Sequence, residues 1–146
     1  MKARNVHRPQ NNVYDQKNII LFDGICNLCN RSVQFIIRND PDARFKFATL
    51  QSARGQTLLQ AHPLVNNSSA TVVYFKEGKA YVKSTAVLQV FKTLGWPFKI
   101  LYVCMIIPKP VRDFLYDLVA KWRYQIFGKR IICMVPTKEI QSRFIE

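Results

Sequence analysis

The stretch NIILFDGICNLC, residues 18–29, decides the fold, because an apolar run leads directly into a segment with helical periodicity. Residues 18–22 are almost wholly apolar, as expected for a central strand covered on both faces. A helix is predicted from about residue 26 to residue 38, ending near Asn39-Asp40-Pro41. The junction therefore places two thiols, Cys26 and Cys29, three residues apart where a strand passes into a helix.

The position of these two thiols indicates redox chemistry. A helix N-terminus carries unpaired N–H donors and partial positive charge, which favour thiolate over thiol in its first turn. Cys26 is therefore the predicted nucleophile, exposed at the N-terminal end of the helix. Cys29 shares one helical face with Val33 and Ile36, so it is expected to point toward the core. The pattern predicts an exposed attacking thiol and a sheltered resolving thiol.

Asp23 has two candidate roles beside this pair. As a cap, its carboxylate would accept N–H bonds at the start of the helix. As a catalytic group, it would accept the Cys29 proton when that sulfur attacks a mixed disulfide. Its negative charge would oppose thiolate formation at Cys26, whereas the helix terminus would favour it. The sequence leaves both roles open.

Two other interpretations of the thiol pair must be weighed. Zinc commonly takes two such pairs or one pair plus a close histidine pair, whereas Cys104 and Cys133 stand alone and the histidines are His7 and His62. Two buried, inert thiols are the other alternative, because free cysteine packs like a small hydrophobic residue. The redox interpretation predicts no metal and no organic cofactor, since the electrons reside on the sulfur pair.

Length and composition suit one globular domain. With 146 residues and 49% hydrophobic content, the chain can form a buried hydrophobic core without stabilising disulfide bonds. Residues 1–17 are polar and basic and contain no apolar segment, so no secretory signal is expected. We therefore predict a cytoplasmic protein, in a reducing compartment where closely spaced cysteines are more often catalytic or metal-binding than structural.

The formal net charge of +13 raises the question of a polyanionic partner. The basic residues are spread along the chain, and no recognisable nucleic-acid-binding motif accompanies them. A diffuse basic surface attracts polyanions and anionic lipid headgroups alike. We therefore expect no specific nucleic-acid partner, and at most a weak contact with an anionic membrane surface.

Further elements are predicted from the periodicity of the apolar residues and from the glycine, proline and polar residues between them. They are a strand at 44–48, a weak helix at 51–61, a loop at 62–69, a strand at 70–75, a turn at 77–79, a strand at 80–82, and a helix at 85–94 capped by Ser84 and ended by Gly95. The first strand, helix and strand should form a right-handed unit with parallel strands. The complete order, β-α-β-α-β-β-α, predicts a thioredoxin-like α/β core over residues 18–95.

Residues 96–146 are predicted to form a helical extension packed on the same domain, after a polar basic tail at 1–17. The apolar segment 100–107 is too short to span a bilayer and is expected to be a packed helix. Segment 111–127 carries an apolar stripe that is also expected to be buried. The alternative is a redox-silent binding module that docks on a protein or an anionic membrane surface. Its candidate contacts are Trp96, Phe98, Lys99, Tyr102, Lys109 and Arg112.

The motif Asp23-x-x-Cys26-x-x-Cys29 resembles the signature of the DCC family of thiol-disulfide oxidoreductases. The resemblance extends over residues 19–136 and includes WRYQIFG at 122–128 and CMVP at 133–136. It implies a thioredoxin-like fold, protein-disulfide reductase activity, and a disulfide-containing protein or a small thiol as substrate. Cys133, within the matching tail, is a candidate additional thiol, with a buried structural cysteine as the alternative.

Overall fold

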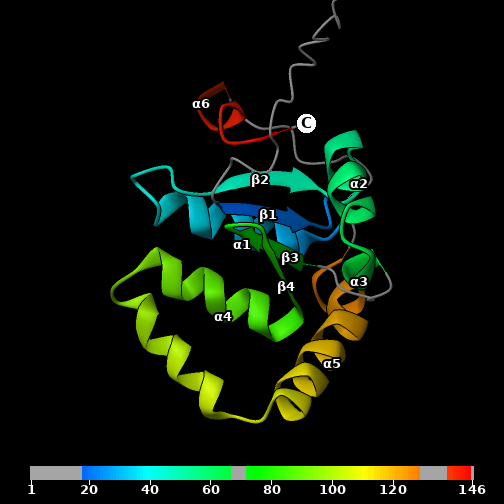
Figure 1. Cartoon of the computed structure of the whole chain (residues 1–146), viewed down its shortest axis with the longest axis vertical. Coiled ribbons are helices and arrows are strands. Elements are labelled where there is room, and N and C mark those ends of the chain that lie inside the picture. The colour runs from blue at the N-terminus through cyan, green and yellow to red at the C-terminus, as the bar shows by residue number, and fades with distance from the viewer. Residues whose placement is uncertain (1–17, 67–71, 129–137, 146) are drawn as a thin grey trace, which may run out of the picture.

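The computed structural model describes residues 18–66, 72–128 and 138–145. Strands β1 (Asn18–Phe22), β2 (Lys46–Thr49), β3 (Val72–Lys76) and β4 (Lys79–Val82) form one sheet in the order β2-β1-β3-β4. β1 and β2 are parallel, whereas β3 is antiparallel to both β1 and β4. This topology confirms the thioredoxin-like α/β core, with the predicted parallel unit at its start (Figure 1).

Helices cover both faces of the sheet. In chain order they are α1 (Asn27–Arg38), α2 (Ala53–Gln60), α3 (Pro63–Asn66), α4 (Lys83–Leu94), the 3-10 helix η2 (Phe98–Ile106), α5 (Lys109–Phe127) and α6 (Lys138–Gln141). The side chains of β1 alternate between two buried clusters. Ile20 and Phe22 pack with residues of α1 and α4, while Ile19 and Leu21 pack with residues of α2 and α3. The prediction of a central strand covered on both faces is confirmed.

Two local predictions in the core are corrected. The expected loop at 62–69 contains the short helix α3, and residues 67–71 lie outside the described part of the chain. Ser84 does not cap α4, because the helix begins one residue before it and Val82 occupies the N-cap position. The Ser84 hydroxyl instead donates a hydrogen bond to Asp113 of α5.

The prediction that the extension buries its apolar residues is wrong. η2 has no buried residue, and the only buried residue of α5 is Arg123. The side of α5 that faces α4 carries Asp113 and Asp117, which bind Ser84 and Lys83, so the apolar stripe is turned outward. We call the exposed apolar residues of the two elements and of the link between them the η2–α5 face: Ile100, Leu101, Val103, Ile106, Ile107, Val111, Phe114, Leu115, Leu118, Val119, Trp122, Ile126 and Phe127.

None of the helices in the described ranges is both long enough and apolar enough to cross a membrane. In Figure 1, η2 and α5 project beyond α4 on the side away from β2 and meet at residues 107–109. The η2–α5 face therefore belongs to a projecting hairpin of helices.

The described C-terminal residues return to the free edge of β2. Phe144 forms a parallel bridge with Phe47, and the backbone N–H of Phe47 donates to the carbonyl of Arg143 at 2.8 Å. Arg143 is buried and binds the Asp40 carboxylate just after α1. This return contact, which the sequence did not predict, joins the end of the chain to the core.

Candidate functional site

Both thiols lie at the start of α1, as predicted, but neither is exposed. Cys26 is the N-cap residue, in extended backbone conformation, and α1 begins at the next residue. Its side chain is 0% exposed and that of Cys29 is 6% exposed. The expectation of an exposed attacking thiol is therefore wrong, whereas the sheltered position of Cys29 is confirmed.

The C-terminal end of α5 meets the N-terminus of α1. The side-chain amide of Asn27 donates to the carbonyl of Phe127 at 2.8 Å, and its backbone N–H donates to the carbonyl of Gly128 at 3.4 Å. Gly128 has φ 78°, and a Cβ there would lie 3.3 Å from Asn27 Nδ2. The carbonyl end of one helix thus satisfies an N–H at the start of the other, which brings the negative end of α5 close to Cys26.

The environment of Cys29 disfavours its thiolate. Burial, first, and then the charge of Cys26 and a hydrogen bond with Cys26 raise the pKa of Cys29 to about 12. Arg123 lowers this pKa and Asp23 raises it, each by a smaller amount. Cys29 is therefore a thiol at neutral pH, and its sulfur lies within hydrogen-bonding reach of Cys26.

Asp23 is the centre of a buried hydrogen-bond network rather than a cap of α1. Its Oδ1 accepts from the Ile25 backbone N–H at 3.1 Å and from Gln51 Nε2 at 2.9 Å. Its Oδ2 accepts from Arg123 Nη2 at 3.0 Å and from the Tyr124 hydroxyl. The N-cap residue of α1 makes no side-chain capping bond, and Ile25 precedes the helix. The network joins the end of β1, the loop before α2, and α5.

These contacts determine the charge of Asp23. Burial alone would raise the pKa of Asp23, but hydrogen bonds from Tyr124, Gln51 and the Ile25 backbone, together with the positive charge of Arg123, bring it below its ordinary value. Burial and the hydrogen bond to Asp23 raise the pKa of Tyr124, which keeps its proton. At neutral pH the site therefore contains a carboxylate, a guanidinium and a neutral phenol.

Arg123 is the functional residue that sequence reasoning missed most clearly. It is 9% exposed, and within the described ranges its Nε and Nη1 atoms are buried without a hydrogen-bond partner. Tyr124 and Gln51 were missed as well. The available signal was the stretch WRYQIFG, which carries Arg123 and Tyr124 and was recognised only as part of a family resemblance.

Asn30 holds the loop between β1 and α1. It is fully buried, its Nδ2 donates to the carbonyl of Gly24 at 3.0 Å, and its Oδ1 has no partner among the described residues. The N–H of Gly24 in turn donates to Gln51 Oε1 at 3.2 Å. The backbone that positions Cys26 is thus fixed from both sides.

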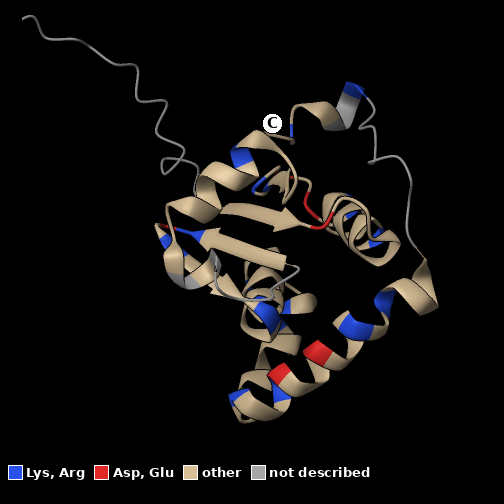
Figure 2. Cartoon of the chain, turned by 90° about the vertical axis from the view of Figure 1, so that its right-hand side faces the viewer, with Lys and Arg blue, Asp and Glu red and all other residues tan. Residues whose placement is uncertain are grey.

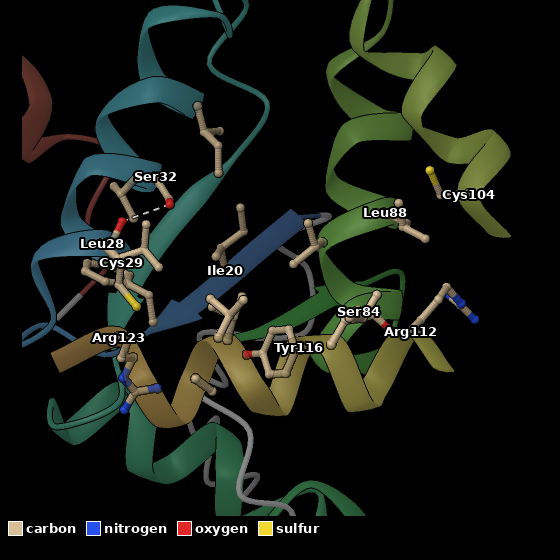
Figure 3. A pocket seen from close by; sticks show the side chains of 18 of the residues that line it. Ile20, Leu28, Cys29, Ser32, Ser84, Leu88, Cys104, Arg112, Tyr116 and Arg123 are labelled. Carbon is tan, nitrogen blue, oxygen red and sulfur yellow. Dashed lines mark hydrogen bonds between the residues drawn. The ribbon is translucent and has the colours of Figure 1, made fainter. Parts of the chain in front are cut away.

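A cavity of about 490 Å³ lies beside the thiol pair, between α1, α4, α5 and the sheet (Figure 3). Its lining is mainly apolar and includes Cys29 at one end and Cys104 at the other, whereas Cys26 does not line it. The Arg123 guanidinium points away from the cavity (Figure 3). Leu115 and Val119 line the cavity and also belong to the η2–α5 face, so the cavity borders that face.

Within the part of the chain that the structure describes, no three His, Cys, Asp or Glu side chains gather as metal ligands would. Cys104 is exposed on η2. Cys133, the candidate additional thiol, lies outside the described residues.

Comparisons with known proteins match most of the chain. Residues 20–129 match the model of a family described as DCC1-like thiol-disulfide oxidoreductase. The chain is 45% identical over 127 residues to the uncharacterised protein YuxK of Bacillus subtilis, covering 87% of this chain and 93% of that protein. It is 38% identical over 120 residues to a chloroplastic DCC family protein of Arabidopsis thaliana, covering 82% of this chain and 70% of that protein. No solved structure shows significant similarity.

Proposed function

The chain belongs to the DCC1-like thiol-disulfide oxidoreductase family, and we propose that it reduces disulfides by cycling Cys26 and Cys29 between dithiol and disulfide. The observation that supports this most directly is the adjacency of the two sulfurs at the start of α1, where Cys29 shares a hydrogen bond with Cys26. Family membership alone implies oxidoreductase chemistry. The assignment of steps to residues is our proposal.

The reaction proceeds in two exchanges. The Cys26 thiolate attacks one sulfur of a substrate disulfide, forms a mixed disulfide with it, and releases the other sulfur as a thiolate that takes a proton from solvent. Cys29 then loses its proton and attacks the Cys26 sulfur, which releases the second substrate thiol and leaves a Cys26–Cys29 disulfide. Two electrons and two protons pass to the substrate. A second dithiol, from a protein or a small molecule, restores the reduced pair.

The Asp23–Arg123 pair acts on the second exchange. Arg123 favours the Cys29 thiolate and Asp23 opposes it, so the balance between their charges adjusts how readily Cys29 ionises. Because its pKa is lowered, Asp23 is a weak base in the resting protein. We propose that it accepts the Cys29 proton only transiently, as the thiolate attacks, and that its resting role is to hold Arg123 and Tyr124.

Access to Cys26 requires motion. Cys26 is fully buried, and the end of α5 is hydrogen-bonded to Asn27 beside it. We propose that the end of α5 moves away from α1 when a substrate disulfide binds. The substrate is a disulfide-containing protein or a small disulfide, without an organic cofactor, and we place the reaction in the reducing cytoplasm.

A redox titration with mass detection tests the proposal. The full chain is equilibrated in glutathione buffers of increasing oxidising strength, alkylated under denaturing conditions, and digested. Cys26 and Cys29 should be lost from the alkylated pool together, in one two-electron transition, as a disulfide within one peptide. A pair that stays reduced in every buffer, or that becomes linked to Cys104 instead, would contradict the proposal.

A trapping experiment tests the order of the two thiols. Cys29→Ser should accumulate mixed disulfides through Cys26, because the resolving sulfur is missing. Cys26→Ser is the matched control and should accumulate far fewer, since Cys29 is held as a thiol. If Cys26→Ser traps more than Cys29→Ser, the two roles are reversed.

The alternative is a binding module without redox activity, and the observation that favours it is the exposed η2–α5 face. The redox titration separates the two functions, because an inert thiol pair would not form the Cys26–Cys29 disulfide reversibly. Docking and catalysis can also coexist in one protein, since the face and the thiols use different residues.

A further inference from the structure

The most unusual surface of this protein is the η2–α5 face. Soluble monomers rarely expose large contiguous apolar patches, and such patches mark sites of interaction. Ile106 is 83% exposed, Ile126 70% and Phe114 66%. Trp96, just before η2, is 78% exposed. The sequence pattern predicted that these segments would be buried, so the face needs an occupant that none of the described residues supplies.

The charges around the face favour an anionic occupant. Lys99 and Lys121 are exposed on the same two elements, and so is Lys109, whose Nζ lies 3.6 Å from the Asp113 carboxylate. The two acidic residues of α5 point to its other side, where Asp117 binds Lys83 at 3.1 Å and Asp113 binds Ser84. Figure 2 shows these two acidic residues in the middle of α5 with basic residues on either side of them. The whole chain carries a net charge of +13, which adds a long-range attraction to any anionic surface.

The shape of the two elements also fits a surface rather than a pocket. η2 and α5 meet at residues 107–109 and project away from the sheet (Figure 1). Ile106 lies at this junction with Lys109 nearby in sequence, so apolar and basic groups occur together at the most projecting point. Apolar residues flanked by lysine and tryptophan are typical of segments that lie in the interface of an anionic bilayer.

We propose that the η2–α5 face docks the protein on an anionic phospholipid membrane, with the apolar side chains inserted at the level of the headgroups. A second copy of the chain is a poorer occupant, because pairing two such faces would bring together two bodies of net charge +13. This docking uses neither Cys26 nor Cys29. The docking proposal can therefore be tested separately from the proposed thiol chemistry.

The two tryptophans of the chain give a direct readout, because Trp96 and Trp122 are both exposed on or beside this face. The full-length reduced protein is mixed with vesicles of phosphatidylcholine, with or without about 30 mol % phosphatidylglycerol, at low and physiological salt. We expect co-sedimentation and a blue shift of tryptophan emission with the anionic vesicles, weakened by salt. Vesicles of phosphatidylcholine alone should bind at least about tenfold less protein.

Matched variants separate insertion from diffuse charge. Ile106→Glu with Phe114→Glu places two carboxylates on the face, at two of its most exposed positions. Ala53→Glu with Gln60→Glu makes the same change of net charge on exposed positions of α2. The first pair should weaken partitioning at least about tenfold, and by more than the second pair does. Far-UV circular dichroism should show that both variants remain folded.

Three outcomes would overturn the proposal. Wild-type protein that stays in the supernatant with anionic vesicles would show that the face has no affinity for lipid. Equal binding by the two double variants would assign any binding to net charge alone. A wild-type dimer in sedimentation velocity that Ile106→Glu with Phe114→Glu abolishes, without vesicle binding by the wild type, would make the face a self-association surface.

Discussion

At the scale of single residues, Asp23 connects parts of the chain that are far apart in sequence. Its carboxylate binds Arg123 and Tyr124, about one hundred positions later, together with Gln51 and the Ile25 backbone. A cap would tolerate asparagine, because the amide oxygen can still accept a backbone N–H. A buried ion pair would not, because asparagine leaves the guanidinium charge uncompensated. Asparagine at position 23 is therefore expected to destabilise the protein, whereas a simple cap would have tolerated it.

We predict that Asp23→Asn lowers the free energy of unfolding by about 3–5 kcal/mol, the usual cost of removing one partner of a buried ion pair. Asp42→Asn is the matched control, because Asp42 forms an exposed pair with Arg44 and should lose no more than about 1 kcal/mol. Urea unfolding of both reduced variants measures the difference. Equal losses would show that the Asp23–Arg123 pair stabilises the protein no more than a surface pair does.

The lowered pKa of Asp23 predicts a dependence of stability on acid. Its charged form is favoured in the folded state, so its contribution is complete above the unfolded pKa of 3.8 and is lost as the pH falls through the folded value. The stability difference between wild type and Asp23→Asn should therefore be constant above about pH 5 and shrink below about pH 4. Urea unfolding at a series of pH values tests this. A difference that persists undiminished in acid would contradict the lowered pKa.

Thiol reactivity should follow exposure and ionisation together. In the native reduced protein we expect Cys104 to alkylate first, because it is exposed, then Cys26, and Cys29 last. With a pKa of about 12, Cys29 is ionised to only about one part in 10⁵ at pH 7. Peptide-resolved alkylation rates measure the order, and the same measurement in urea should bring the three rates together. Cys29 reacting faster than Cys26 in the native protein would contradict it.

At the scale of elements, the sequence predicted what is local and missed what is not. The strand at 18–22 and the end of α4 at Gly95 were predictable, because an apolar run and a glycine at positive φ act over a few residues. The stripe of α5 was also real, but periodicity shows which residues share a face and not what covers that face. Its direction depends on polar contacts with α4, such as Ser84 to Asp113.

The candidate site likewise combines local features that the sequence predicts with long-range contacts that it does not. The spacing and position of Cys26 and Cys29 were readable from sequence, because they depend on one strand and the helix after it. Their burial was not, since it depends on parts of the chain that are distant in sequence, such as the end of α5, which is hydrogen-bonded to Asn27 beside Cys26. The partner of Asp23 was not readable either, because an ion pair across one hundred residues leaves no local pattern.

The contact between α5 and α1 gives a prediction about thiol access. Gly128→Ala adds a methyl group 3.3 Å from Asn27 Nδ2, at a backbone φ of 78° that disfavours alanine. Gly78→Ala is the matched control, because Gly78 has the same φ of 78° but open space around it. Both should cost about 1 kcal/mol in stability, whereas only Gly128→Ala should speed alkylation of Cys26, by severalfold. An equal effect of both variants on Cys26 would show that the end of α5 does not control access.

At the scale of the whole molecule, two buried Asp–Arg pairs join distant parts of the chain to the core. Arg123 brings α5 to the end of β1, and Arg143 brings the last described residues to Asp40 after α1. Each pair stabilises the protein only while both partners are held in place. The helical extension and the sheet should therefore depend on one another, although η2 and most of α5 bury little apolar surface.

We accordingly predict one cooperative unfolding transition for the core and the extension. In a Trp96→Phe background, the fluorescence of Trp122 reports on α5, whereas far-UV circular dichroism reports on all helices and strands together. The two signals should give the same urea midpoint, because α5 cannot unfold without breaking the ion pair between Arg123 and Asp23. An earlier fluorescence transition would instead make the extension a separately unfolding unit. In that case Cys26 should become reactive at the urea concentration where Trp122 changes, since the end of α5 shields it.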